Sequence, residues 1–151
     1  MKFFVGTYKN KMDAKGRISL PAPFRDIVTE GSGTAFYIFP SPNSNTLEAG
    51  GSDLMQYIAS SIEEQAPMFS QEEDALSYIM ASARLVQCDS TGRFVMPAEF
   101  IEFASLGDSV SFVGKARRFQ IQNSQYNEVN APTLRDSFSK SELTIKKPSG
   151  V

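Results

Sequence analysis

Basic side chains gather near the start of the chain at spacings suited to binding an anion. Lys9 and Lys11 are two residues apart, as are Lys15 and Arg17, so each pair projects to one side of an extended backbone. If the two segments pair across the turn between them, a two-stranded ribbon presents all four cations together. Such a ribbon fits the major groove of DNA. Arg25, on the helix expected next, would add a phosphate contact.

The arginine of this turn also has a purely structural interpretation. Arg17 stands four residues after Asp13, and Arg93 stands four residues after Asp89 in a second, similar turn. A guanidinium and a carboxylate at this spacing can pair inside the turn without any partner molecule. From the sequence, both interpretations stay open for both arginines.

The two turns belong to an internal repeat with an offset of 76 residues, because residues 8–28 align without gaps with residues 84–104. In each copy a short strand leads into Asp-x-x-Gly-Arg, a second strand follows, and a proline precedes a short amphipathic helix. Glycine permits the positive φ of such a turn, and proline suits the first turn of a helix. Each copy is followed by a hairpin, over residues 35–47 and 110–122.

A module of about 45 residues buries too little apolar surface to be stable alone. We therefore expect the two copies to interleave their hairpins around one core, in a mainly β fold with helices and an approximate twofold axis. Apolar residues at four-residue spacing predict two connecting helices, over 53–65 and 71–84. The expected divisions are module 1 over 5–52, a helical connector over 53–80, module 2 over 81–128 and a flexible tail over 129–151.

The net charge of −2 conceals a strong segregation along the chain. Residues 1–28 carry six basic residues against two acids, whereas residues 29–83 carry eight acids and no Lys or Arg. Residues 84–128 are neutral on balance, and residues 129–151 are weakly basic. The basic first module is therefore the expected interaction surface.

The second module lacks most of these cations. Lys9, Lys11, Lys15 and Arg25 of the first copy are replaced by Leu85, Gln87, Thr91 and Ile101 in the second. Only the arginine of the turn persists, as Arg93. We expect the second module mainly to complete the fold.

Nothing in the chain predicts an enzyme, a metal site, a cofactor or a small-molecule substrate. The sequence has no histidine, which removes the commonest general base and a common zinc ligand. The single cysteine, Cys88, occupies the position of Met12 in the first copy and is expected in the core. Acidic runs such as 72–74 suit a helix N-terminus. No apolar run is long enough to cross a bilayer, the start offers no signal-peptide core, and one cysteine fits a reducing cytoplasm.

The repeated motifs resemble those of the MraZ family of bacterial transcriptional regulators, which are related to AbrB-like DNA-binding proteins. The matching features are Phe4-x-Gly6, the segment 13–25 with its Asp-x-Lys-Gly-Arg turn, the segment 89–99 with the second turn, and the strand around 119–121. The likeness covers residues 3 to about 128, with both copies in order and a helical connector between them. This combination is far more specific than a lone Asp-x-x-Gly-Arg.

The resemblance implies a tandem swapped-hairpin AbrB-like β-barrel with approximate twofold symmetry, and assembly into homo-oligomeric rings, of which an octamer is one candidate. It implies a cytoplasmic, nucleoid-associated regulator that binds repeated boxes in double-stranded DNA upstream of its own operon, usually repressing a cell-division and cell-wall gene cluster. The expected DNA contacts are Lys15 and Arg17, supported by Lys9 or Lys11 and by Arg25, with a smaller contribution from Arg93.

A second function stays open from the sequence. A ring-forming protein-interaction module could use the basic turn to dock an acidic partner, in an antitoxin-like or enzyme-modulating role without specific DNA binding. A gel-shift assay on the DNA upstream of the gene, at several salt concentrations, distinguishes the two functions.

Overall fold

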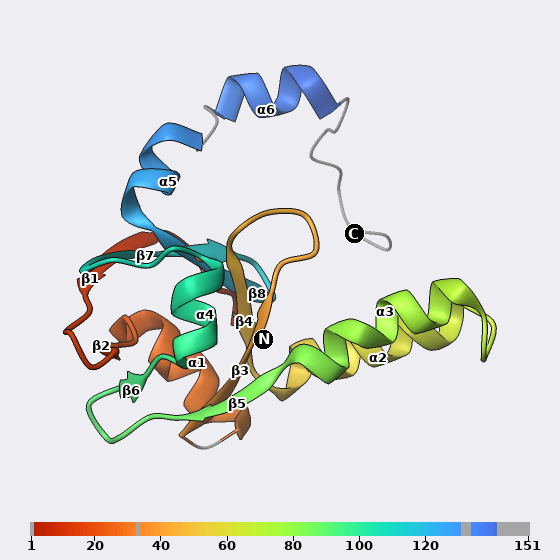
Figure 1. Cartoon of the computed structure of the whole chain (residues 1–151), viewed down its shortest axis with the longest axis horizontal. Helices are drawn as coiled ribbons and strands as arrows, with labels where there is room; N and C mark the ends of the chain where they lie inside the picture. Colours follow the sequence, from red (N-terminus) through yellow and green to blue (C-terminus); the bar gives the residue numbers. More distant parts are fainter. Residues whose placement is uncertain (1, 33, 131–133, 142–151) are drawn as a thin grey trace.

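A computed structural model describes residues 2–32, 34–130 and 134–141 of the chain (Figure 1). The strands are β1 (Thr7–Lys11), β2 (Arg17–Ser19), β3 (Ala35–Pro40), β4 (Leu47–Gly50), β5 (Arg84–Gln87), β6 (Arg93–Val95), β7 (Ser109–Lys115) and β8 (Arg118–Asn123). The helices are α1 (Ala22–Ser32), α2 (Ser52–Gln65), α3 (Gln71–Ser82), α4 (Ala98–Phe103), α5 (Ser124–Asn130) and α6 (Leu134–Ser141).

Strand pairing is antiparallel throughout the described sheets and largely joins one repeat to the other. Six strands form one sheet in the order β1-β7-β8-β4-β3-β5, and β2 pairs with β6 in a separate ribbon. The first strand of each repeat pairs with the third strand of the other, as β1 with β7 and β5 with β3. The pairs β2–β6 and β4–β8 each join a strand of one repeat to the equivalent strand of the other. The pattern of strand pairing is therefore unchanged when the two repeats are exchanged.

The strand order corrects the expectation of a closed barrel. Within the described residues, the large sheet ends at β1 on one side and at β5 on the other, and its hydrogen bonding does not close. The strands that would lie between these edges, β2 and β6, are three residues long and pair with each other. Pro21 and Pro97 follow soon after them, and proline cannot donate to a ladder. The fold is a mixed α/β fold with antiparallel sheets.

The prediction of a basic ribbon within the first repeat is also wrong. Strand β1, which carries Lys9 and Lys11, pairs with β7 rather than with β2. The ribbon that does form joins β2 to β6, with Ile18 opposite Phe94. Both of these side chains are buried, so exchanging the strands places an apolar residue from each repeat in the same core.

An aromatic cluster occupies the centre of this core. The Phe119 ring lies 4.9 Å from Phe4, 5.1 Å from Phe24 and 5.9 Å from Phe36, measured between ring centroids. These residues come from β8, the N-terminal segment, α1 and β3, so the cluster joins elements of both repeats. Aromatic pairs at such separations add to the free energy of area burial.

Helices α2 and α3 form a hairpin that extends away from the sheets, and only its base is anchored (Figure 1). Leu54 and Met55 of α2 pack with Phe39 of β3 in a second, small apolar cluster. Both helices lie where the apolar spacing predicts them, with α3 ending at Ser82. None of the described helices is both long and apolar enough to cross a membrane.

The C-terminal region contains two helices that the sequence analysis did not predict. Helix α5 packs on β7, where the Ser124 hydroxyl accepts a hydrogen bond from the Ser109 hydroxyl and shares another with the Ser111 hydroxyl. Helix α6 falls within the expected flexible tail over 129–151, of which residues 131–133 and 142–151 lie outside the described residues. The division into two modules, a connector and a tail stays a prediction.

The core cluster yields a stability prediction. Replacing Phe119 with Ala should lower the free energy of unfolding by about 3–5 kcal/mol, because truncating a buried ring leaves a cavity among its neighbours. Urea denaturation followed by circular dichroism measures the change. The matched control Phe103→Ala, at an exposed helix position, should cost only about 1 kcal/mol. Equal losses for the two variants would contradict the central place of Phe119.

Candidate nucleic-acid interface

The Asp13 carboxylate organises the turn that carries the first candidate site. Its Oδ1 accepts hydrogen bonds from the backbone N–H groups of Lys15 and Arg17, both at 2.9 Å. The N–H of Gly16 donates to the Asp13 carbonyl at 3.0 Å, and Gly16 adopts a φ of +82°. That φ favours glycine because a Cβ would be strained there. Local chemistry therefore sets the backbone path on which Lys15 and Arg17 stand.

The second repeat forms the same turn from its own residues. Asp89 Oδ1 accepts from the backbone N–H groups of Thr91 and Arg93, both at 2.9 Å, and from the Thr91 hydroxyl at 2.7 Å. Gly92 has a φ of +83°. The Asp-x-x-Gly-Arg motif thus specifies the same local structure twice.

Each turn is fastened by the strand of the other repeat. The N–H of Met96 donates to the Gly16 carbonyl, and the N–H of Leu20 donates to the Gly92 carbonyl, both at 2.8 Å. A Cβ at Gly16 would lie 3.1 Å from the Met96 carbonyl oxygen. Since neither turn is held only by its own repeat, the two turns have a defined position relative to one another.

The ribbon of β2 and β6 places two arginines on one exposed face. Along each strand the middle residue is buried, whereas Arg17 and Arg93 are exposed. Because Arg17 pairs with Val95 and Arg93 pairs with Ser19, the two guanidinium-bearing residues lie diagonally across the ribbon. Both also line a shallow hollow together with Lys11. The structure therefore brings Lys11, Arg17 and Arg93 together.

Two other predicted site residues are engaged differently. Lys9 Nζ lies 2.6 Å from the Glu128 carboxylate of α5. Arg25 reaches the second turn rather than the first, because a Cβ at Gly92 would lie 3.0 Å from Arg25 Cδ. The equivalent Ile101 lies over the first turn in the same way, 3.3 Å from such a Cβ at Gly16. The sequence offered no signal for this crossover, because it follows from the exchange of strands.

The second turn is consequently more basic than its own sequence suggests. Its repeat supplies Arg93, and the first repeat supplies Arg25 beside Gly92. The sequence analysis assigned the second module mainly to completing the fold. The structure places Arg25 of the first module on the second turn. Each turn therefore carries two basic residues, and one of the two is the arginine of the Asp-x-x-Gly-Arg motif.

The ion pair of the structural interpretation is present in the first turn. Arg17 Nε donates to Asp13 Oδ2 at 2.6 Å. The guanidinium has five N–H donors, and this contact uses only the one on Nε. The Nη groups retain donors of their own, so the pair orients Arg17 without consuming its capacity to bind an anion.

Both aspartates favour their charged form. Hydrogen bonds from the backbone and side chain of Arg17 lower the pKa of Asp13 below the ordinary value of 3.8. In the second turn the hydrogen bond from the Thr91 hydroxyl is the largest cause, and the pKa of Asp89 is also lowered. The carboxylates therefore remain acceptors for the turn across the physiological range.

The thiol of Cys88, the single cysteine of the sequence, is buried. Burial raises the pKa of the Cys88 thiol to about 11, so at neutral pH it is protonated and a poor nucleophile. Within the described ranges, no three Cys, Asp or Glu side chains gather into a metal-binding group.

The sequence of this chain is similar to known proteins over the region that contains the first turn. A family model described as "MraZ protein, putative antitoxin-like" matches residues 3–43, which include the first turn. The curated transcriptional regulator MraZ of Methylocella silvestris is 34% identical over 122 residues, which are 80% of this chain and 74% of that protein. The chain belongs to the MraZ family.

Two more MraZ proteins show how far the likeness extends. The transcriptional regulator MraZ of Gluconacetobacter diazotrophicus is 37% identical over 125 residues, covering 80% of this chain and 78% of that protein. The one from Azorhizobium caulinodans is 28% identical over 150 residues, covering 99% and 96%. MraZ is a family of transcriptional regulators and not of enzymes.

The hydrogen bonding of the first turn predicts its pH dependence. Because Arg17 lowers the pKa of Asp13, the stabilisation from the carboxylate is complete above the aspartate pKa of the unfolded chain, and it is lost as the pH falls through the lower folded-state value. In an NMR titration the amide signals of Lys15 and Arg17 should shift together with a midpoint below 3.8. Asp13→Asn should abolish this titration. A midpoint at or above the ordinary value would contradict the assigned contacts.

Proposed function

We propose that this chain regulates transcription by binding double-stranded DNA through the exposed face of the β2–β6 ribbon. The observation that carries the proposal is the juxtaposition of Arg17 and Arg93 on that face, with Lys11 beside them. The relatives named above are transcriptional regulators, which supports a nucleic-acid ligand over an acidic protein.

The geometry suits a duplex in two ways. A two-stranded ribbon has the width of the major groove, and arginines on its outer face can reach phosphates or the acceptor edge of guanine. The two turns repeat the same backbone structure, so they can meet equivalent sites on the DNA. Lys15 on the first turn and Arg25 over the second extend the cationic surface at either side.

Binding by one subunit would be modest, because few basic residues contact the duplex. We propose that several copies form a ring and engage repeated boxes at once, so that effective concentration supplies affinity. The boxes would lie upstream of the protein's own operon, within a cell-division and cell-wall gene cluster, and occupancy would repress it. An AbrB-like, swapped-hairpin architecture and a cytoplasmic, nucleoid-associated location are parts of the same proposal.

Removing the central arginine tests the site. Arg17→Ala should weaken binding to DNA from upstream of the gene by about 10- to 100-fold and reduce the slope of log affinity against log salt by about one. Arg93→Ala should weaken binding by a smaller factor. Gel-shift titrations at several salt concentrations measure both effects, and circular dichroism confirms that each variant is folded.

Arg84→Ala is the matched control for loss of one positive charge. Arg84 is exposed, pairs with Glu99 at 2.6 Å and lies at the start of β5, outside both turns. Its replacement should leave DNA binding within about twofold, as for a surface ion pair of little net value. If Arg17→Ala binds as tightly as Arg84→Ala, the assigned DNA site is wrong. If the unaltered protein does not prefer its upstream DNA over unrelated DNA at any salt concentration, the protein-interaction alternative replaces the proposal.

A further inference from the structure

The hairpin of α2 and α3, residues 52–82, forms an arm whose tip is apolar and unusually exposed. Phe69 is 93% exposed and Met68 is 74% exposed, both in the loop that joins the two helices. Figure 1 shows the arm extending from the sheets on the side away from β2 and β6. Two adjacent large apolar side chains exposed to this degree form a candidate site for a protein contact.

The backbone of the tip holds Phe69 outward at an energetic cost. Phe69 has a φ of +69°, in the left-handed region that bulky residues rarely adopt. Ser70 caps α3 by accepting from the N–H of Glu73 at 3.0 Å, which sets the direction of the chain directly after Phe69. The fold thus maintains an unfavourable conformation that displays an aromatic ring, and nothing in the proposed DNA site uses it.

Acidic residues surround this tip. Residues 29–83 contain no Lys or Arg, and five of their eight acids lie in the two helix ends next to the loop: Glu63, Glu64, Glu72, Glu73 and Asp74. A specific protein interface has an apolar core and a polar rim, and a rim of one charge sign selects a partner of the opposite sign. The partner surface should therefore be apolar at its centre and basic around it.

A surface of that description lies on the same chain. We call it the docking patch: Phe3, Val5, Lys115 and Arg117, all of which are exposed. They are neighbours because Phe4 bridges to Ala116, with its N–H donating at 2.8 Å and its carbonyl accepting at 3.2 Å. Val5 is 70% exposed and Phe3 is 50% exposed, whereas Phe4 between them is buried.

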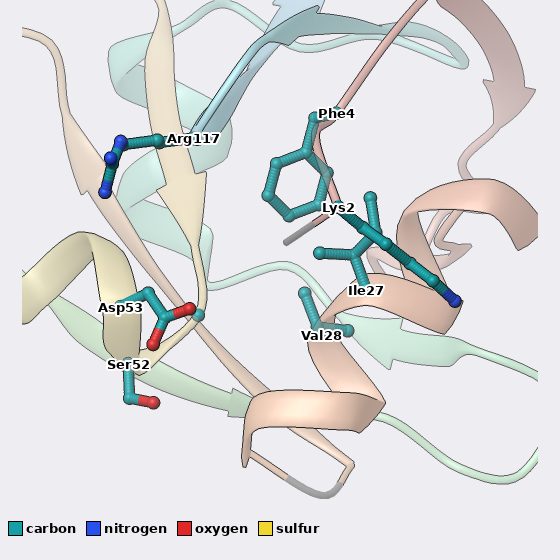
Figure 2. Close-up of a pocket in the computed structure, with 8 residues that line it drawn as sticks. Lys2, Phe4, Ile27, Val28, Ser52, Asp53 and Arg117 are labelled. Atoms are coloured by element: carbon teal, nitrogen blue, oxygen red, sulfur yellow. The ribbon is translucent and has the colours of Figure 1, made fainter. Parts of the chain in front are cut away.

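The docking patch is not a small-molecule site. The hollow next to it, between Phe4, Arg117 and the start of α2, has a volume of about 40 Å³, far below the size of a ligand pocket. Figure 2 shows Phe4 as part of the lining of this hollow, between Arg117 on one side and Lys2 on the other. Arg117 also stacks over the Tyr57 ring of α2, 5.5 Å from its centroid. A surface with so small a hollow suits a protein partner better than a small molecule.

The arm cannot reach the docking patch of its own chain. The patch lies at the base of the arm, where Ser52 and Asp53 begin α2. Fourteen residues of helix separate that base from the tip by about 20 Å. A contact between tip and patch must therefore join two molecules.

The docking patch is also separate from the proposed DNA site. Lys11 of that site pairs with Ser109 at one end of β7, and Lys115 of the patch is at the other end. Seven residues of strand span about 20 Å. Both surfaces can therefore be occupied at the same time.

We propose that the arm tip of one subunit docks on the docking patch of a second copy of this chain, with Phe69 packed against Phe3 and Val5 and the acids of the tip facing Lys115 and Arg117. The contact uses two different surfaces, so it is a head-to-tail interface, and a head-to-tail interface that closes produces a ring. This inference rests on the self-assembly in the proposed function and names the surfaces that carry it.

The full-length chain and its variants test the interface through their mass in solution. Light scattering coupled to size exclusion should show an assembly for the unaltered protein. Phe69→Ser should weaken self-association by about 30-fold, the loss typical of an aromatic hot spot. Tyr78→Ser is the matched control, because Tyr78 is an exposed aromatic residue on the same arm but away from the tip, and it should assemble like the unaltered protein.

Charge reversal tests which surface the tip meets. Glu72→Lys and Lys115→Glu should each weaken the assembly, and an equimolar mixture of the two variants should associate more tightly than either alone. Rescue of this kind supports the pairing of tip with patch and cannot result from misfolding, which thermal unfolding of each variant also checks.

The outcomes separate this inference from the proposed function. An assembly of unchanged mass in Phe69→Ser overturns the arm interface and leaves self-assembly standing. A loss of assembly in Phe69→Ser without rescue by the charge-reversed mixture overturns the docking patch as the acceptor. A monomeric unaltered protein overturns both the ring and this interface, whereas the proposed DNA site is judged separately by the gel shift with Arg17→Ala.

Discussion

The exchange of strands between the two repeats is the constraint on which the rest of the structure depends. Each short module has too little apolar surface for a core of its own, and pairing β1 with β7 and β5 with β3 lets both contribute to one. The hydrogen bonds from Met96 to Gly16 and from Leu20 to Gly92 belong to the same exchange. The packing that stabilises the fold therefore also sets the position of the two turns, and disturbing one would disturb the other.

The turn itself reconciles two roles that are alternatives in the sequence. Asp13 orders the backbone by accepting from two N–H groups, and its other oxygen orients Arg17. A side chain that is already oriented loses less conformational entropy when it binds a phosphate or a base. The carboxylate lowers the local positive charge, yet the arginine remains exposed with unused donors. The ion pair thus supports the binding geometry, so the structural and the binding role of Arg17 are compatible.

Charge is separated in space as well as in sequence. The cations of the proposed DNA site cluster at the ribbon, and the acids concentrate on the arm at the far side of the molecule (Figure 1). This separation keeps the acids of the arm away from the polyanionic duplex, where they would oppose binding. It also leaves a second basic surface, around Lys115 and Arg117, that matches the acidic tip. A small overall charge is compatible with both contacts because each depends on local charge.

The sequence by itself determined the features that depend on neighbouring residues: the repeat, the Asp-x-x-Gly-Arg turns, the two connecting helices and the residues of the first turn. Only the tertiary structure decided which strands pair, and it replaced the expected β1–β2 ribbon with β2–β6. That choice placed Arg93 beside Arg17, moved Arg25 to the second turn and directed Lys9 to Glu128. Turn and helix preferences act over a few residues and can therefore be predicted from a sequence. Strand partners are chosen by the burial of a shared core, which depends on residues far apart in the chain.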